Sequence, residues 1–323
     1  MSAPRDPRLL VVALGGRALH GPAPRAGRGP GRRTGHEAWL RALEGSLPPV
    51  VDVAAAGFRV VLVHGGPPSV DDGRRGTSGR AAAPPLALDL RAAEVQATAG
   101  YGVQQALGNL GRTRGVDVPS AVVLTRVEVA ADDAAFGRPT RAVGPPYSAN
   151  AARRLGRERG WTFLGPASAR RRLVPSPRPR RVLEAGVIRR LADAGVLTIT
   201  AGGGGVPVIE TGEGHRGVEA ILEEEATAGL LATALAADRL VFLTGVDQVE
   251  VGHRTTRAIG VERLSLAEAR ALLKAREFPP GSIGPKIEAA VEFVEAGGRE
   301  AIITSPAALR AALDGRAGTR VVR

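Results

Sequence analysis

The sequence contains no cysteine, which excludes disulfide bonds and thiolate metal sites. Aromatic residues make up only 3% of the 323 residues, so few side chains are available to stack on nucleic-acid bases. No apolar run approaches the roughly 18 residues of a membrane-spanning helix, and the first residues lack the apolar core of a signal peptide. A cytoplasmic protein without a membrane partner is therefore expected.

The chain is strongly basic, with a net charge of +12 and an isoelectric point near 11.3. One interpretation is a nucleic-acid or acidic-membrane partner. The other is a bias toward arginine, some of which steers anionic substrates to the protein. Because the sequence shows no helix-turn-helix, zinc-finger or RRM signature, a small-molecule substrate is expected and a nucleic-acid partner is not.

Lysine is almost absent, since arginine supplies all but two of the 44 basic residues. Lys286 follows a glycine-rich loop and Pro285, at the start of an apolar-periodic helix. A cation there opposes the helix dipole, typically by ~0.3–1 kcal/mol, whereas a bound anion reverses that sign. The segment fits a phosphate site, and it equally fits a solvated surface lysine after a turn.

Short apolar runs alternate with helical patterns along the chain. The expected strands cover residues 9–14, 59–64, 120–125, 196–200, 240–244 and 300–304, and the expected helices cover about 37–56, 87–110, 183–194, 217–237, 265–274 and 286–297. The strand-like runs are continuous rather than alternating, which is typical of strands buried on both faces of a parallel sheet. The pattern predicts a three-layer α/β/α sandwich with a mostly parallel sheet.

Three of the expected strands end in glycine clusters, at Gly15-Gly16, Gly65-Gly66 and residues 202–205. Ligands of open parallel sheets collect at the carboxyl ends of strands, and glycine lets backbone N–H groups approach them closely. Three clusters and the Lys286 loop together favour an anion site. The spacing fits neither a P-loop nor a dinucleotide fingerprint.

Two segments are expected to be loops or inserted pieces. Residues 21–35 are rich in Pro, Gly and Arg and predict an irregular loop. Residues 127–182 contain many prolines and arginines and few periodic apolar patterns. They predict a lid or small subdomain over the site.

From about residue 8 to the end, the ordered motifs resemble carbamate kinase of the amino-acid-kinase superfamily. The opening strand with Gly15-Gly16 and the run at 201–209 are similar to that family. So are the long helix with Gln96, the lid motif around Arg141, residues 174–177, the strand ending at Thr244, and the loop that leads to Lys286.

The resemblance implies a single domain over residues 1–323 with a sheet of about eight strands, a lid at 127–182 and a nucleotide-binding part at 216–323. It also implies a homodimer in arginine metabolism and reversible phosphoryl transfer between ATP and carbamate, with Mg²⁺. The implied catalytic residues are Gly15, Gly16, Arg17, Arg141 and Lys286; the implied substrate-binding residues are Gly65, Gly66, Gln96, Gly203 and Gly204; the implied nucleotide-binding residues are Thr244, Asp247, Gly281, Ser282, Gly284 and Lys286.

The sequence departs from the family pattern where the chemistry is expected. Arg17 stands where the family has Asn, and Arg141 where it has a lid lysine. His64-Gly65-Gly66-Pro67 replaces a loop with Asn, and Glu224 replaces a lysine. Losing such a cation beside a phosphoryl group would cost roughly a thousandfold in rate. Arg17 is either a compensating cation or a solvated turn residue. Glu224 is a metal ligand, a solvated helix residue or the partner of an arginine.

These departures leave three hypotheses. The protein is a carbamate kinase with a rearranged site, a relative that acts on another small acid, or a non-catalytic nucleotide-binding or regulatory homologue. His64, at a strand end, is read as a packing or hydrogen-bonding residue rather than a catalytic base. No metal-ligand spacing is found among the histidines, so no protein metal site is predicted.

Overall fold

The computed structural model describes residues 8–16, 35–65, 86–252, 258–278 and 283–323. Its centre is an eight-stranded sheet, and within it only the β16–β17 pair is antiparallel. In spatial order the strands are β15 (Arg263–Ser265), β17 (Thr319–Val322), β16 (Glu300–Thr304), β12 (Arg239–Leu243), β1 (Leu9–Leu14), β2 (Arg59–His64), β9 (Leu197–Thr200) and β3 (Ser120–Val123). The predicted mostly parallel sheet of about eight strands is confirmed.

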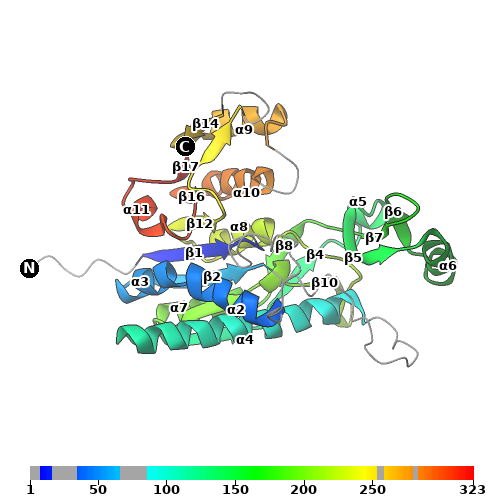
Figure 1. Cartoon of the computed structure of the whole chain (residues 1–323), viewed down its shortest axis with the longest axis horizontal. Helices are drawn as coiled ribbons and strands as arrows, with labels where there is room; N and C mark the ends of the chain where they lie inside the picture. Colours follow the sequence, from blue (N-terminus) through cyan, green and yellow to red (C-terminus); the bar gives the residue numbers. More distant parts are fainter. Residues whose placement is uncertain (1–7, 17–34, 66–85, 253–257, 279–282) are drawn as a thin grey trace, which may run out of the picture.

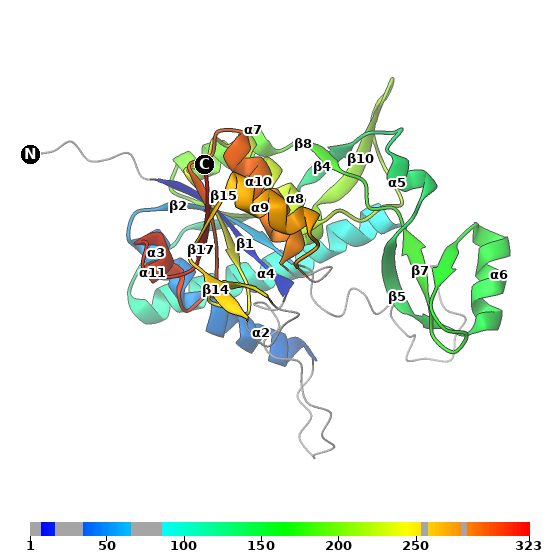
Figure 2. The same cartoon turned by 90° about the horizontal axis from the view of Figure 1, so that it is seen from above.

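Helices cover both faces of this sheet, as the two views together show (Figures 1 and 2). One face carries α2 (Gly35–Ser46), α3 (Pro48–Ala55), α4 (Leu88–Arg114) and α11 (Leu309–Leu313); the other carries α7 (Ala185–Asp193), α8 (Glu224–Ala234), α9 (Leu266–Lys274) and α10 (Gly284–Glu295). Successive residues of β1 alternate between the two apolar clusters, since side chains of a strand point to opposite faces. Both faces are buried, which explains why the strand sequences are continuously apolar and confirms the three layers.

Three smaller sheets complete the fold. A four-stranded sheet has the order β11 (Gly214–Gly217), β10 (Val206–Thr211), β4 (Arg126–Val129), β8 (Pro179–Val182), and β13 (Val249–Val251) pairs with β14 (Ile259–Val261). A three-stranded sheet has the order β5 (Arg141–Tyr147), β7 (Arg170–Val174), β6 (Thr162–Leu164), and it packs with α6 (Ala149–Arg159).

The segment expected as a lid is divided between two of these sheets. Its ends, β4 and β8, pair with each other in the four-stranded sheet. Its middle, from β5 to β7, projects from the body together with α6, beyond the short helix α5 (Ala134–Gly137) (Figures 1 and 2). We call residues 141–174 the projecting unit. Movement of this unit as a lid stays a prediction.

Two expected helices differ from the structure. The helix expected over 37–56 is two helices, because Pro48 begins α3 one residue after Leu47. The helix expected over 217–237 begins only at Glu224, so the prediction is wrong for residues 217–223. Gly217 instead ends β11 in register with Val208, and a Cβ there would lie 2.0 Å from Asp89 Oδ2. The expected loop at 21–35 lies outside the described residues, except for Gly35.

Candidate functional site

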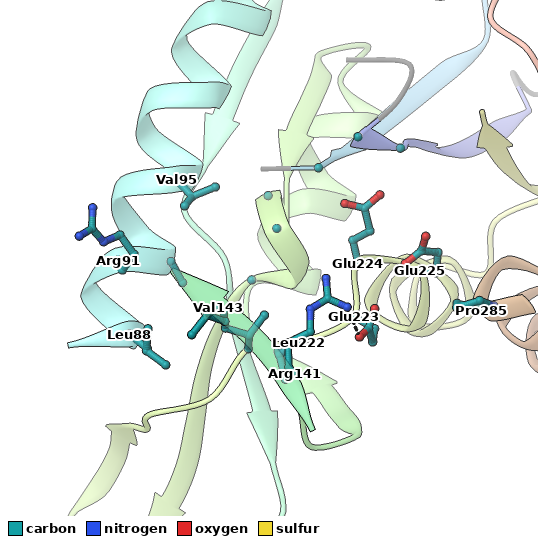
Figure 3. Close-up of a pocket in the computed structure, with 18 of the residues that line it drawn as sticks. Leu88, Arg91, Val95, Arg141, Val143, Leu222, Glu223, Glu224, Glu225 and Pro285 are labelled. Carbon is teal, nitrogen blue, oxygen red and sulfur yellow. Dashed lines mark hydrogen bonds and ion pairs between the residues drawn. The ribbon is translucent and has the colours of Figure 1, made fainter. Parts of the chain in front are cut away.

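The carboxyl ends of β1, β2, β9 and β12 meet at one edge of the sheet, because neighbouring pairs among these strands are parallel. A cavity of about 530 Å³ opens at this edge, between the sheet, the first turns of α8 and α10, the start of α4 and the projecting unit (Figure 3). The glycines expected after β1, β2 and β9 contribute Gly15, Gly16, Gly65, Gly202, Gly203 and Gly205 to its wall.

The backbone conformation after β9 requires glycine at several positions. Ala201 has φ 49°, and Gly203, Gly204 and Gly205 have φ 62°, 94° and 91°, which is the left-handed region that glycine enters without strain. Gly202 has a different reason, because a Cβ there would lie 2.3 Å from Cε1 of His64. The run therefore folds into the short 3-10 turn η2 (Gly202–Gly204) against β2 and forms one wall of the cavity.

Lys286 lies in the first turn of α10 and lines the cavity. Its Nζ donates to Glu225 Oε1 at 2.6 Å, and both side chains are nearly buried, with 10% and 12% of their surface exposed. Gly15 lies between Lys286 and Glu224, since a Cβ there would be 3.7 Å from Lys286 Cε and 3.8 Å from Glu224 Oε1. The solvated-surface interpretation of Lys286 is wrong, because this lysine is buried beside the glycine turn.

Glu224 is the first residue of α8, and its carboxylate extends toward the ends of β1 and β2 (Figure 3). Its Oε2 lies 2.8 Å from the position that a Cβ of Gly65 would take. Burial, Glu225 and Glu223 raise the pKa of Glu224 to about 8, although Lys286 and Arg141 act in the opposite direction. The carboxyl group is therefore mostly protonated near neutral pH.

Arg141, the first residue of β5, connects the projecting unit to the body. Its Nη1 lies 2.5 Å from Oε1 of Glu223, the residue that precedes α8. The two side chains are 45% and 36% exposed, so water screens this ion pair more than the Lys286 pair. The contact joins the projecting unit to the rim of the cavity.

Seven of the residues predicted for the site line the cavity together: Gly15, Gly16, Gly65, Arg141, Gly203, Thr244 and Lys286. Gln96 is buried elsewhere, and its side-chain amide is hydrogen-bonded at both ends to the backbone of Thr125. Gly204 and Gly284 lie beside the wall without lining it, and Asp247 is exposed. Arg17, Gly66, Gly281 and Ser282 lie outside the described residues.

The sequence did not predict the cavity wall that α4 and β7 supply. Leu88, Arg91, Ala92 and Val95 lie on one face of α4 at helical spacing, and Arg171 adds a cation from β7. The helical spacing of these α4 residues can be read from the sequence. The same spacing is typical of residues that pack in a core, so it does not by itself indicate a cavity wall.

His64 is buried at the end of β2, where its Nδ1 lies 2.8 Å from the carbonyl oxygen of Gly65. Burial lowers its pKa, so the imidazole is neutral. Its contacts with Gly65 and Gly202 confirm the packing and hydrogen-bonding interpretation.

Among the described residues, no group of three or more His, Cys, Asp or Glu side chains is arranged to hold a metal ion. No helix in the described part of the chain is long and apolar enough to cross a membrane.

Comparison with known proteins assigns this chain and its fold to a family. A family model described as "Amino acid kinase family" matches residues 8–305. The chain is 35% identical to "Carbamate kinase 3" of Staphylococcus aureus, over 97% of this chain and 98% of that protein. It is 39% identical to "Carbamate kinase" of Halobacterium salinarum, over 97% of each. The chain belongs to the carbamate kinase family.

A solved structure supports the same assignment. The structure "Carbamate kinase from Giardia lamblia bound to AMP-PNP" matches with a TM-score of 0.88 and 31% identity, over 100% of this chain and 99% of that one. The similarity extends over the whole length and includes the strand ends that form the cavity. The chain is thus a carbamate-kinase-like phosphotransferase, in which Glu224 and Arg141 stand at two positions where the family resemblance implies lysine.

Proposed function

We propose that this protein catalyses reversible phosphoryl transfer between ATP and carbamate, giving ADP and carbamoyl phosphate. One observation carries the proposal: Lys286, Arg141 and the glycine turns after β1, β2 and β9 all line one cavity at the carboxyl edge of the sheet. Phosphoryl transfer depends mainly on positioning and on neutralising charge, and this cavity offers both.

The nucleotide phosphates are assigned to the part of the cavity near Thr244, Pro285 and Lys286. Lys286 stands at the start of α10, where the helix dipole also favours an anion. Residues 216–323, which include this part, are proposed as the nucleotide-binding part. Mg²⁺ enters as the ATP complex, and we assign it no protein ligand, since the described residues include no group of three or more His, Cys, Asp or Glu side chains arranged for a metal ion.

The acceptor is assigned to the glycine turns at Gly15, Gly16 and Gly65, next to Glu224. In the forward direction a carboxylate oxygen of carbamate forms a bond to the γ-phosphorus as the bond to the β-γ bridging oxygen breaks, and ADP leaves with that electron pair. Arg141 and Lys286 both line the cavity and can balance charge during this step. We further propose that the projecting unit closes over the reactants as a lid, guided by Arg141.

An assay that couples ATP formation to carbamoyl phosphate and ADP tests the proposal. We expect ATP formation that depends on protein and on Mg²⁺ and falls by roughly 10²–10³ in Lys286→Ala. If wild type gives no ATP, calorimetry with ADP separates the remaining alternatives. A protein that binds ADP acts on another small acid or regulates, and one that binds no nucleotide is not a kinase.

We also propose that the protein is a homodimer that works in the cytoplasm in arginine metabolism. Support comes from the resemblance described above and from the lack of cysteine. Light scattering coupled to size exclusion tests the dimer, and a mass near 33.3 kDa would show a monomer instead.

A further inference from the structure

Glu224 is an acidic side chain in a cavity that otherwise suits anions. Its Oε2 is 2.8 Å from the Cβ position of Gly65, and its Oε1 is 3.8 Å from that of Gly15. The absence of side chains at both glycines leaves room for the carboxyl group at the strand ends. Figure 3 shows Glu224 extended toward these ends. The group therefore occupies the part of the cavity assigned above to the acceptor.

The neighbouring cations of the cavity already have carboxylate partners. Lys286 is paired with Glu225 at 2.6 Å, and Arg141 is paired with Glu223 at 2.5 Å. Among the residues that the structure describes, the Glu224 carboxyl group forms no hydrogen bond and no ion pair. A polar group left in this way at a cavity wall is expected to find its partner on a ligand.

The charged groups that act on Glu224 come from α8, α10 and β5, whereas the described turns after β1, β2 and β9 contribute only glycines. Glu223 directly precedes α8 and Glu225 lies in its first turn. Lys286 comes from α10, and Arg141 comes from β5. Arg91 of α4 and Arg171 of β7 also line the cavity, and the imidazole of His64 is neutral and turned to Gly65. Two adjacent carboxylates and burial favour the protonated form of Glu224, with a pKa of about 8.

A protonated carboxyl group presents one donor and one acceptor on the same edge. An acid bearing an amino group next to its carboxyl carbon presents the complementary edge, with an N–H donor beside an oxygen acceptor. Carbamate and carbamoyl phosphate both have this edge. Acetate and acetyl phosphate have the same shape, but a methyl group replaces the amino group and donates no hydrogen bond.

We propose that Glu224 selects the acceptor through a pair of hydrogen bonds, and that the selected class is small acids with an N–H group on the reacting carboxyl carbon. The Glu224 O–H donates to the acceptor oxygen that does not attack phosphorus, and the Glu224 carbonyl oxygen accepts from the acceptor N–H. The proposal rests on the phosphotransferase function proposed above. It explains how an acidic side chain is compatible with an anion site, since the neutral form does not repel the substrate.

Two consequences distinguish this role from a merely structural one. Replacing the amino group by methyl leaves the Glu224 carbonyl oxygen without its partner, which lowers the specificity for acetyl phosphate. Ionisation of Glu224 removes the donor and introduces repulsion, so turnover of carbamoyl phosphate declines as the pH rises above about 8.

The experiment measures kcat/KM for ATP formation from carbamoyl phosphate and from acetyl phosphate, between pH 6.5 and 9.5. It compares wild type, Glu224→Gln and Glu224→Ala. Glutamine keeps a donor and an acceptor on one edge but does not titrate, whereas alanine has neither. Thermal unfolding of each variant at pH 6.5 checks that all three are folded.

Wild type is expected to prefer carbamoyl phosphate at least about 10-fold, as one lost hydrogen bond of ~1.4 kcal/mol implies. Glu224→Gln is expected to keep that preference and to lose the decline above pH 8. Glu224→Ala is expected to treat the two acyl phosphates within about 3-fold of each other, consistent with loss of the hydrogen-bonding edge. Equal use of both substrates by wild type, or a Glu224→Gln variant as unselective as Glu224→Ala, would overturn the proposal.

Calorimetric binding of the two acyl phosphates to the same three proteins separates this proposal from the proposed function. If wild type binds carbamoyl phosphate selectively and Glu224→Ala does not, but no ATP forms, the phosphotransferase function fails and the role of Glu224 stands. If ATP forms from both substrates alike and binding shows no preference, the function stands and the role of Glu224 fails. If ATP formation instead rises above pH 8 in wild type only, Glu224 acts in its ionised form and the proposal is wrong.

Discussion

Lys286 and Glu225 lie 61 residues apart in the sequence, and their side chains meet at 2.6 Å between the first turns of α10 and α8. This ion pair places the only lysine of the cavity wall, among the residues described, beside the glycine turn after β1. Lys286 therefore has two roles in our interpretation. It pairs with Glu225 between α8 and α10, and it supplies the positive charge proposed to contact the phosphoryl group.

Replacing Lys286 by alanine is expected to reduce ATP formation by roughly 10²–10³, the usual effect of removing one group that stabilises transition-state charge. Because Glu225 is left buried without this partner, the variant is also expected to lose about 3 kcal/mol of unfolding free energy. Coupled assays and urea unfolding measure the two effects separately.

The double variant Lys286→Met with Glu225→Gln separates stability from chemistry. It removes the buried charges together, so stability should recover most of the loss while activity stays low. Lys274→Ala is the matched control, since Lys274 is the other lysine of the chain and is exposed at the end of α9. Recovery of activity in the double variant would show that Lys286 acts only through folding.

Glu224 is expected to make the stability of the protein depend on pH. Its pKa is about 8 in the folded protein and near 4.5 when unfolded, so the folded state binds the proton more tightly. The stabilisation is complete below about pH 4.5 and is lost as the pH rises through 8. Glu224→Gln should therefore be more stable than wild type at pH 9, by a few kcal/mol, with a much smaller gain at pH 5. Urea unfolding at both pH values measures this, and an equal gain at pH 5 and pH 9 would contradict the raised pKa.

The sheet was predictable from the sequence because its strands are buried on both faces. The continuous apolar runs of β1 and β2 are typical of strands buried on both faces of a sheet, and glycines at their ends mark the ligand edge. The start of α8 was not predictable in the same way, since the apolar pattern continues N-terminally into Val218 and Ala220. In the structure Gly217 pairs with β10, and this tertiary contact keeps residue 217 in a strand rather than in a helix.

The composition of the site was predictable, but its pairings were not. Glycine clusters and Lys286 identify an anion site by local chemistry. Sequence pattern alone does not show that Lys286 pairs with Glu225 rather than facing Glu224, because adjacent residues of a helix point about 100° apart and only the fold sets the direction. Gln96 does not line the cavity, and its side-chain amide holds the Thr125 backbone, so a substrate-binding role for this residue stays a prediction.

Arg141 and Glu223 join the projecting unit to the body, and Arg141→Ala is expected to raise the KM for carbamoyl phosphate by about 10-fold, which corresponds to ~1.4 kcal/mol. The change in unfolding free energy should stay below about 1 kcal/mol, because both side chains are more than a third exposed. Arg154→Ala is the control, as Arg154 lies in α6 of the same unit in a 3.9 Å exposed pair with Glu158. If the two arginine variants have the same KM, Arg141 does not act on the substrate.

Gly202→Ala tests whether the glycine turn after β9 positions the cavity wall. An added Cβ would lie 2.3 Å from Cε1 of His64, whose buried ring has little room to move. We expect a loss of about 1–3 kcal/mol in unfolding free energy from overpacking. ATP formation is expected to fall by about 10-fold or more, because His64 precedes Gly65 at the acceptor end of the cavity.

Gly108→Ala is the matched control for this substitution. Gly108 is an exposed residue of α4, and a Cβ there meets no atom within 4 Å among the described residues. Alanine favours the helix over glycine by about 0.8–1 kcal/mol, so this variant should gain stability and keep wild-type activity. A Gly202→Ala variant that behaves like Gly108→Ala would mean that the His64 ring moves freely, and that the close packing of β2 against the glycine turn does not position the acceptor.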